Sequence, residues 1–150
     1  MMLSNVRTVS LSLFVFVLLI VPLLFCKQSS DIITKEIAEA QSQSKSQNKK
    51  LILVFGADWC PDCRALDSIF SDLEVRKVLD SNFILHKVDV GRFDKNLEIN
   101  EFYGSPIENG IPALVVLDPS GEILTSTKGG EFSSASKMTK EQVLEYLYRL

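Results

Sequence analysis

The chain has 150 residues, the length of one ordinary domain, and its formal net charge of −3 does not indicate nucleic-acid binding. Its three cysteines are too few for a disulfide-stapled scaffold. A structural zinc site normally needs four ligands, and only one histidine, His86, could supplement a close cysteine pair, which argues against zinc.

Residues 1–26 differ from the rest of the chain. Arg7 is their only charged side chain, and residues 11–25 are apolar except for Ser12 and Pro22. A basic start before a short apolar run is typical of a signal peptide, whereas a membrane span needs about 20 apolar residues. The run lies between these lengths, and a buried core helix is the remaining reading. We interpret the segment as a signal peptide or an N-terminal membrane anchor, which places the rest of the chain outside the cytoplasm.

Cys26 ends this segment, and residues 23–26 resemble a bacterial lipoprotein signal. In such signals the cysteine becomes the acylated N-terminus, although Phe25 departs from the small residue usual before it. Three fates stay open: lipidation at Cys26, an uncleaved anchor, or soluble secretion. All three place the domain in the periplasm or cell envelope. One acyl chain holds a membrane only marginally, so a firm lipid anchor needs more than one.

Residues 27–50 are polar and predict a helix followed by a connector. Ile33, Ile37 and Ala40 recur at i, i+4 and i+7, which predicts the first helix of the fold within residues 31–41. We expect the remainder, rich in Ser, Gln and Lys, to be a solvated connector. A disordered tether throughout is the alternative.

The main domain, residues 51–150, opens with a strand and a cysteine pair. Residues 51–57 are a continuous apolar run, as in a central strand buried on both faces. The motif Trp59-Cys60-Pro61-Asp62-Cys63 follows and begins a helix. A helix N-terminus stabilises a thiolate, which is the nucleophilic form of cysteine. Cys60 is therefore the candidate nucleophile, and Cys63, one turn on, can close a disulfide with it as the resolving cysteine.

The rest of the chain alternates helices with strands before a closing hairpin. Residues 118–121 have type I turn chemistry between the last two strands. This order predicts an α/β fold, with a mixed central sheet of about four to five strands and helices on both faces. We expect helices over 60–70, 71–80 and 94–102 and from Thr139 onward, with Gln142 completing a capping box, and strands over 83–90, 113–117 and 122–127.

A second motif, Gly110-Ile111-Pro112-Ala113, opens the strand before the hairpin. With both motifs in this order of elements, the chain resembles the thioredoxin superfamily from about Ile32 to Leu150. The resemblance implies the thioredoxin fold and thiol–disulfide exchange without a cofactor other than the redox-active Cys60–Cys63 disulfide. It also implies a cis peptide bond before Pro112, against the cysteines, with the Ile111 backbone free to pair with an extended substrate.

The resemblance implies further site residues at the rim. Trp59 would belong to the partner-contact surface, and Gly129 or Gly130 would form the glycine-bearing loop beside the cysteines. Residues 103–109 are longer than in a minimal thioredoxin and adjoin Pro112, so they could shape partner choice.

Two residues depart from the thioredoxin pattern. Thioredoxins carry a buried carboxylate six residues before the first cysteine, and this chain has Val54 there. The proton acceptor for Cys63 must then be another group, such as water, Asp58 or Asp62. Asp62 should also disfavour the Cys60 thiolate and make the couple more reducing, unless it only complements the helix dipole.

Three functions are compatible with these features. The first is a reductase of extracytoplasmic protein disulfides, recharged by a membrane electron donor because an oxidising compartment lacks a reducing pool. The second is a dithiol oxidase or isomerase, disfavoured by the absence of the large helical insertion usual in oxidases of the superfamily. The third is a non-enzymatic binding or redox-sensing module. We expect a monomer whose partners are protein thiols and disulfides, with no nucleic acid.

Overall fold

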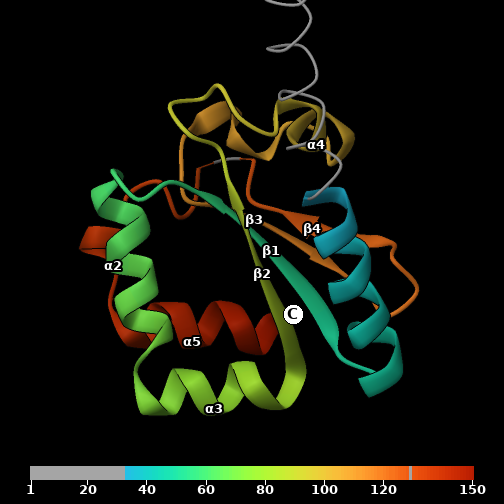
Figure 1. Cartoon of the computed structure of the whole chain (residues 1–150). Coiled ribbons are helices and arrows are strands. Elements are labelled where there is room, and N and C mark those ends of the chain that lie inside the picture. The colour runs from blue at the N-terminus through green and yellow to red at the C-terminus, as the bar shows by residue number, and fades with distance from the viewer. Residues whose placement is uncertain (1–32, 129) are drawn as a thin grey trace, which may run out of the picture.

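A four-stranded sheet lies between two layers of helices in the computed structural model, which describes residues 33–128 and 130–150 (Figure 1). The strand order is β2-β1-β3-β4. β1 (Lys50–Gly56) is parallel to β2 (Phe83–Asp89) and antiparallel to β3 (Ala113–Leu117), which pairs antiparallel with β4 (Ile123–Ser126). The predicted mixed sheet with helices on both faces is confirmed.

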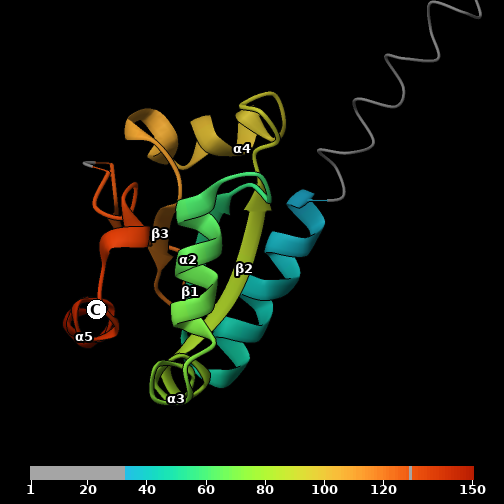
Figure 2. The same cartoon turned by 90° about the vertical axis from the view of Figure 1, so that its left-hand side faces the viewer.

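Helices cover both faces of this sheet. One face packs against α2 (Pro61–Phe70), α3 (Leu73–Asn82) and α5 (Lys140–Arg149). The other packs against a helix over residues 33–47, here called the N-terminal helix, and against α4 (Leu97–Phe102). Figure 2 shows β2 between α2 and the N-terminal helix. Two short 3₁₀ helices, η1 (Pro106–Asn109) and η2 (Ala135–Lys137), complete the described elements.

The apolar run of β1 feeds two separate cores. Leu51, Leu53 and Phe55 are buried in the core shared with the N-terminal helix. Ile52 and Val54 are buried in the core shared with α2, α3 and α5. Successive strand residues point to opposite faces, so a strand covered on both sides must be apolar at every position. The sheet therefore holds the end of β1, where the cysteine motif begins, rigidly between the two cores.

The N-terminal helix is longer than predicted. It continues to residue 47, so the connector expected after residue 41 was wrong. Its apolar stripe ends at Ala40, and hydrogen bonds of polar residues hold the turns beyond, one across the fold and one local. Gln41 Nε2 donates to the carbonyl of Asp118 (3.0 Å), and the buried Ser44 Oγ donates to the carbonyl of Lys49 (2.5 Å). The helix ends at Asn48, whose left-handed φ of +51° suits asparagine.

Other boundaries shift by a few residues. α4 begins at Leu97 rather than 94, because the Asp94 carboxylate accepts from the Arg92 N–H (2.8 Å) within a turn. The capping box of α5 is present as predicted: the Gln142 N–H donates to Thr139 Oγ1 (3.3 Å), and the Thr139 N–H donates to Gln142 Oε1 (2.8 Å).

The predictions for the start of the chain concern residues outside the described part. They are the signal or anchor over 1–26 and the lipidation of Cys26. In the part that the structure describes, no helix combines the length and the apolarity needed to cross a membrane.

Candidate functional site

Cys60 stands at the junction of β1 and α2 and caps the helix. Its backbone is extended (φ −76°, ψ 120°), and its Sγ accepts a hydrogen bond from the Cys63 N–H at 3.2 Å. The first N–H groups of a helix lack partners within it, so a sulfur at the cap position satisfies one of them. Pro61 occupies the first helical position, as predicted. Both cysteines are free thiols.

The second motif meets Cys60 from β3. The Ile111–Pro112 peptide bond is cis, as the resemblance implies. The Cys60 thiol donates to the carbonyl oxygen of Ile111 at 3.6 Å. The fold thus joins two motifs that lie about fifty residues apart in the sequence, and Cys60 is held between a backbone N–H and a backbone carbonyl.

Cys63 is buried against the end of β1. A Cβ added at Gly56 would lie 3.1 Å from the Cys63 Sγ, so the missing side chain of glycine makes room for the sulfur. Burial raises the pKa of Cys63 to about 12, and the hydrogen bond with Cys60 and the charge of Asp67 act in the same direction. The backbone of Ala57 opposes them by hydrogen bonding to the sulfur. Cys63 is therefore a thiol at neutral pH.

A cleft of about 410 Å³ opens beside Cys63, between α2 and the ends of β1 and β2. Val54, which stands where thioredoxins have a carboxylate, forms an apolar part of its wall. Asp58, one of the proton acceptors suggested by the sequence, also lines it. Asp67, which sequence reasoning missed, also lines the cleft and pairs with Lys87 of β2 at 2.7 Å. Its spacing of four residues from Cys63 on one helix was the available signal.

The Asp62 carboxylate is hydrogen-bonded to Ser136. Its carboxylate accepts from the Ser136 N–H (2.8 Å) and from Ser136 Oγ (2.6 Å), which ties α2 to η2. These bonds lower the pKa of Asp62. The lining of the Cys63 cleft includes Asp58 but not Asp62, which weakens Asp62 as a proton acceptor. Its expected effect on the Cys60 thiolate stays a prediction.

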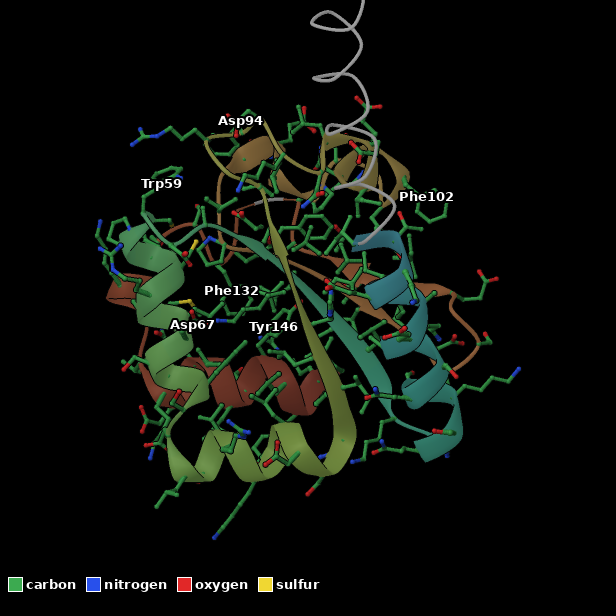
Figure 3. All side chains as sticks on the ribbon, in the orientation of Figure 1. Trp59, Asp67, Asp94, Phe102, Phe132 and Tyr146 are labelled. Carbon is green, nitrogen blue, oxygen red and sulfur yellow. The ribbon has the colours of Figure 1, made fainter. Side chains whose placement is uncertain are left out.

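Trp59, the residue before Cys60, lies at the same end of the molecule as Asp94 (Figure 3). The side chain is 45% exposed, and its Nε1 donates to the carbonyl of Gly91 at 2.6 Å. The ring meets Phe93 edge-to-face, with centroids 6.0 Å apart. Phe93 was not predicted; it is equally exposed and has a left-handed φ of +63°, an uncommon conformation for a bulky residue. Together they form an apolar rim beside Cys60.

The glycine loop packs against the extra segment before the second motif. Gly129 lies outside the described residues. Gly130 has φ +77°, and a Cβ there would lie 2.8 Å from the Asn109 carbonyl oxygen, so the close approach requires glycine. Asn109 Nδ2 also donates to the carbonyl of Lys128. The segment ending in η1 is thereby fixed between this loop and Ile111.

No metal cluster accompanies the site in the residues described: nowhere in 33–128 or 130–150 do three or more His, Cys, Asp or Glu side chains gather to hold an ion. His86 lies in β2 with Nε2 3.9 Å from a Glu36 oxygen of the N-terminal helix. Lys87, the next residue, lines the cleft on the other face of the sheet.

Comparisons with known proteins agree with this fold. A family model described as thioredoxin-like matches residues 32–119, more than half of the chain. The chain belongs to the thioredoxin-like family. A crystal structure described as a disulphide isomerase from Xylella fastidiosa Temecula1 is 39% identical, with a TM-score of 0.75 over 77% of this chain and 88% of that one. The reduced C-terminal domain of Neisseria meningitidis DsbD shares the thioredoxin fold at 20% identity, with a TM-score of 0.57 over 77% of this chain and 95% of that one.

Curated relatives of this thioredoxin-like chain match over shorter stretches. Nucleoredoxin from Xenopus laevis is 25% identical over 124 residues, covering 67% of this chain and 29% of that protein. Thioredoxin H4 from Arabidopsis thaliana is 39% identical over 62 residues, covering 41% and 47%. The chain spans less than half the length of these curated relatives.

The two thiols should differ sharply in reactivity. In the reduced full chain at pH 8, iodoacetamide should modify Cys60 well before Cys63, because a thiol with a pKa of about 12 is ionised there to only about one part in ten thousand. Modification of Cys63 should still be accelerating at pH 10. Peptide mapping of timed samples, in a Cys26→Ser background, measures both rates.

The urea-unfolded chain, in which both cysteines should react alike, is the control. Equal rates in the folded chain would contradict the environment described for Cys63.

Proposed function

We propose that this chain is a thiol–disulfide oxidoreductase that reduces disulfides of proteins outside the cytoplasm. The observation that carries the proposal is the position of the Cys60 sulfur, held at the start of α2 between the Cys63 N–H and the Ile111 carbonyl. A nucleophile and a resolving thiol within one helical turn are the parts that disulfide exchange needs.

The reaction runs in two exchanges. The Cys60 thiolate attacks one sulfur of a substrate disulfide, forming a mixed disulfide while the other substrate sulfur leaves as a thiolate. Cys63 then attacks the Cys60 sulfur, which forms the Cys60–Cys63 disulfide and releases the second substrate thiol. The Ile111 backbone pairs with an extended substrate segment, and the rim of Trp59 and Phe93 contacts its apolar side chains.

Three features support the reducing direction. Cys63 is held as a thiol by burial, so the dithiol form gains no stabilised charge there. Oxidising couples owe their potential to a stabilised reduced form. Asp62, two residues after Cys60, is expected to place negative charge near the nucleophile. Between β2 and β3 the described chain carries only the six-residue α4 and the short η1, without a large helical insertion.

The apolar residues 11–25 support an extracytoplasmic setting. They would export the domain and hold it at the membrane, either as an uncleaved anchor or through lipid on Cys26. Each catalytic cycle leaves the cysteines oxidised, and an oxidising compartment supplies no reducing pool. A membrane protein that donates electrons is therefore a required partner. The chain would act as a monomer.

Cysteine variants test the proposal directly. Cys60→Ser should abolish reduction of insulin disulfides by dithiothreitol-recharged protein, because no mixed disulfide can form. Cys63→Ser should accumulate a mixed disulfide between Cys60 and substrate, seen as a mass increase lost on reduction. Cys26→Ser is the matched control and should retain full activity. Undiminished activity in Cys60→Ser would sink the proposal.

A disulfide isomerase is the second candidate, favoured by the 39% identical structure described by that name. The chemistry is the same, and the reduction potential separates the two. Equilibration of the full chain with glutathione should give a value near that of thioredoxin, about −270 mV, rather than about −180 mV as in protein disulfide isomerase or about −120 mV as in the bacterial oxidase. A value near either of the last two would reverse the proposed direction.

The burial of both thiols favours a third candidate, a non-enzymatic binding module, because Cys60 is only 3% exposed and Cys63 only 8%. An enzyme needs Cys60 to become accessible in the native state. If neither cysteine reacts with iodoacetamide before the chain unfolds, the binding module becomes the better reading.

A further inference from the structure

Cys63 must lose its proton before it can attack, and β1 has no carboxylate beside it to accept that proton. Val54 occupies the strand position that carries a carboxylate in thioredoxins. Burial holds Cys63 as a thiol, yet only a thiolate attacks the mixed disulfide. A group within reach of this sulfur must therefore accept the proton during resolution.

The cleft beside Cys63 is where such a group must lie. The part of β1 that lines it has no charged side chain. The charged side chains come from the other elements around it: Asp58 from the loop before α2, Arg64 and Asp67 from α2, and Lys87 and Asp89 from β2. The volume of about 410 Å³ exceeds the roughly 30 Å³ that one water occupies in the liquid. Hydrogen-bonded water can thus connect the sulfur to a carboxylate at the edge of the cleft.

Of the three carboxylates, that of Asp89 already accepts from two donors. It accepts from Lys95 Nζ (2.9 Å) and from the Gly91 N–H (2.9 Å). Asp67 instead lies one turn beyond Cys63 on the same face of α2. Asp58 also lines the cleft, but within residues 33–128 and 130–150 no ion pair or hydrogen bond holds its carboxylate, whereas Lys87 holds that of Asp67. The charge of Asp67 is the smallest of the causes that raise the pKa of Cys63.

Lys87 fixes Asp67 at this place. Its Nζ lies 2.7 Å from Asp67 Oδ1, and in the sheet Lys87 is the register partner of Val54. The ion pair therefore spans from helix to strand beside the position that the thioredoxin acid would occupy. The Asp67 side chain is 42% exposed, so its carboxylate reaches bulk water as well as the cleft.

We propose that Asp67, positioned by Lys87, accepts the Cys63 proton through water in the cleft, in place of the strand carboxylate that Val54 lacks. The inference rests on the proposed function. The Cys63 sulfur gives its proton to Asp67 and attacks the Cys60 sulfur. The Cys63–Cys60 bond forms, the bond from Cys60 to the substrate sulfur breaks, and the substrate leaves as a thiolate with the bonding electron pair. The Asp67 carboxyl then passes its proton to that thiolate or to solvent.

Neutralisation of Asp67 has a second effect at the moment of attack. An ionised carboxylate near Cys63 disfavours the thiolate, and a protonated one does not. Transfer to this group removes the charge that opposed the transfer. A carboxylate that acted by its charge alone would slow resolution, so its removal would make resolution faster. Removal of a proton acceptor would instead make resolution slower.

Ellman's reagent separates the two exchanges in the full chain with Cys26→Ser. Attack by Cys60 releases the first coloured thiolate, and attack by Cys63 on the resulting mixed disulfide releases the second. Stopped-flow absorbance is recorded from pH 6 to pH 10 for the parent, Asp67→Asn and Asp67→Glu. Asp80→Asn is the matched control, because it removes the same charge from another surface ion pair, that with Arg76 at 3.1 Å.

Asp67→Asn should leave the first release within about twofold of the parent and slow the second at least about tenfold at pH 7, since a positioned general base contributes typically 10²–10⁴-fold. The deficit should shrink as pH rises, because hydroxide then ionises Cys63 without the carboxylate. Asp67→Glu should recover most of the rate, and Asp80→Asn should match the parent.

An unchanged second release in Asp67→Asn would overturn the inference, and a faster one would show that Asp67 acts by charge alone. Either result leaves the proposed function standing if the first release is normal. Absence of the first release in the parent would overturn the proposed function and this inference with it.

Discussion

The sulfur of Cys60 holds the site together by capping α2. The Cys63 N–H donates to it, so one contact both satisfies an open end of the helix and fixes the distance between the two cysteines. The same sulfur reaches the Ile111 carbonyl of the second motif. β1, buried in both cores, sets where this cap stands. Structural and chemical roles therefore converge on a single atom, and a change at the start of α2 alters both.

In the proposed mechanism the carboxylate that accepts the Cys63 proton lies on α2 rather than on β1. A continuous apolar β1 suits burial on two faces, and an ionised carboxylate buried in it costs free energy unless it is paired. Val54 avoids that cost. Asp67 offers a carboxylate at the edge of the cleft, where water and Lys87 solvate it. In the proposed mechanism the chain keeps a buried, protonated Cys63 and still gives its proton a path to solvent.

The sequence predicted what local patterns encode. The apolar run of β1, the helix start at Pro61 and the capping box of α5 all follow from residue type and short spacing. The cis bond before Pro112 was expected from the resemblance to the thioredoxin superfamily. Contacts across the fold left no such pattern. Asp62 and Ser136 are 74 residues apart, and the cleft between Asp67 and Cys63 forms only when α2 packs beside β2. The extended N-terminal helix was missed because its last turns are held by hydrogen bonds of polar residues, from Gln41 to Asp118 across the fold and from Ser44 to Lys49 locally, rather than by an apolar stripe.

Comparing the unfolding free energy of the oxidised and reduced full chain, in a Cys26→Ser background, tests the central claim most directly. In a thermodynamic cycle this difference reports how far the native site favours the Cys60–Cys63 disulfide over the dithiol, relative to the unfolded chain. The helix start already brings the two sulfurs together, and the buried Cys63 gains no stabilised charge on reduction. We expect the oxidised chain to unfold at the higher denaturant concentration. A reduced chain that is the more stable of the two would contradict the reducing direction proposed for this site.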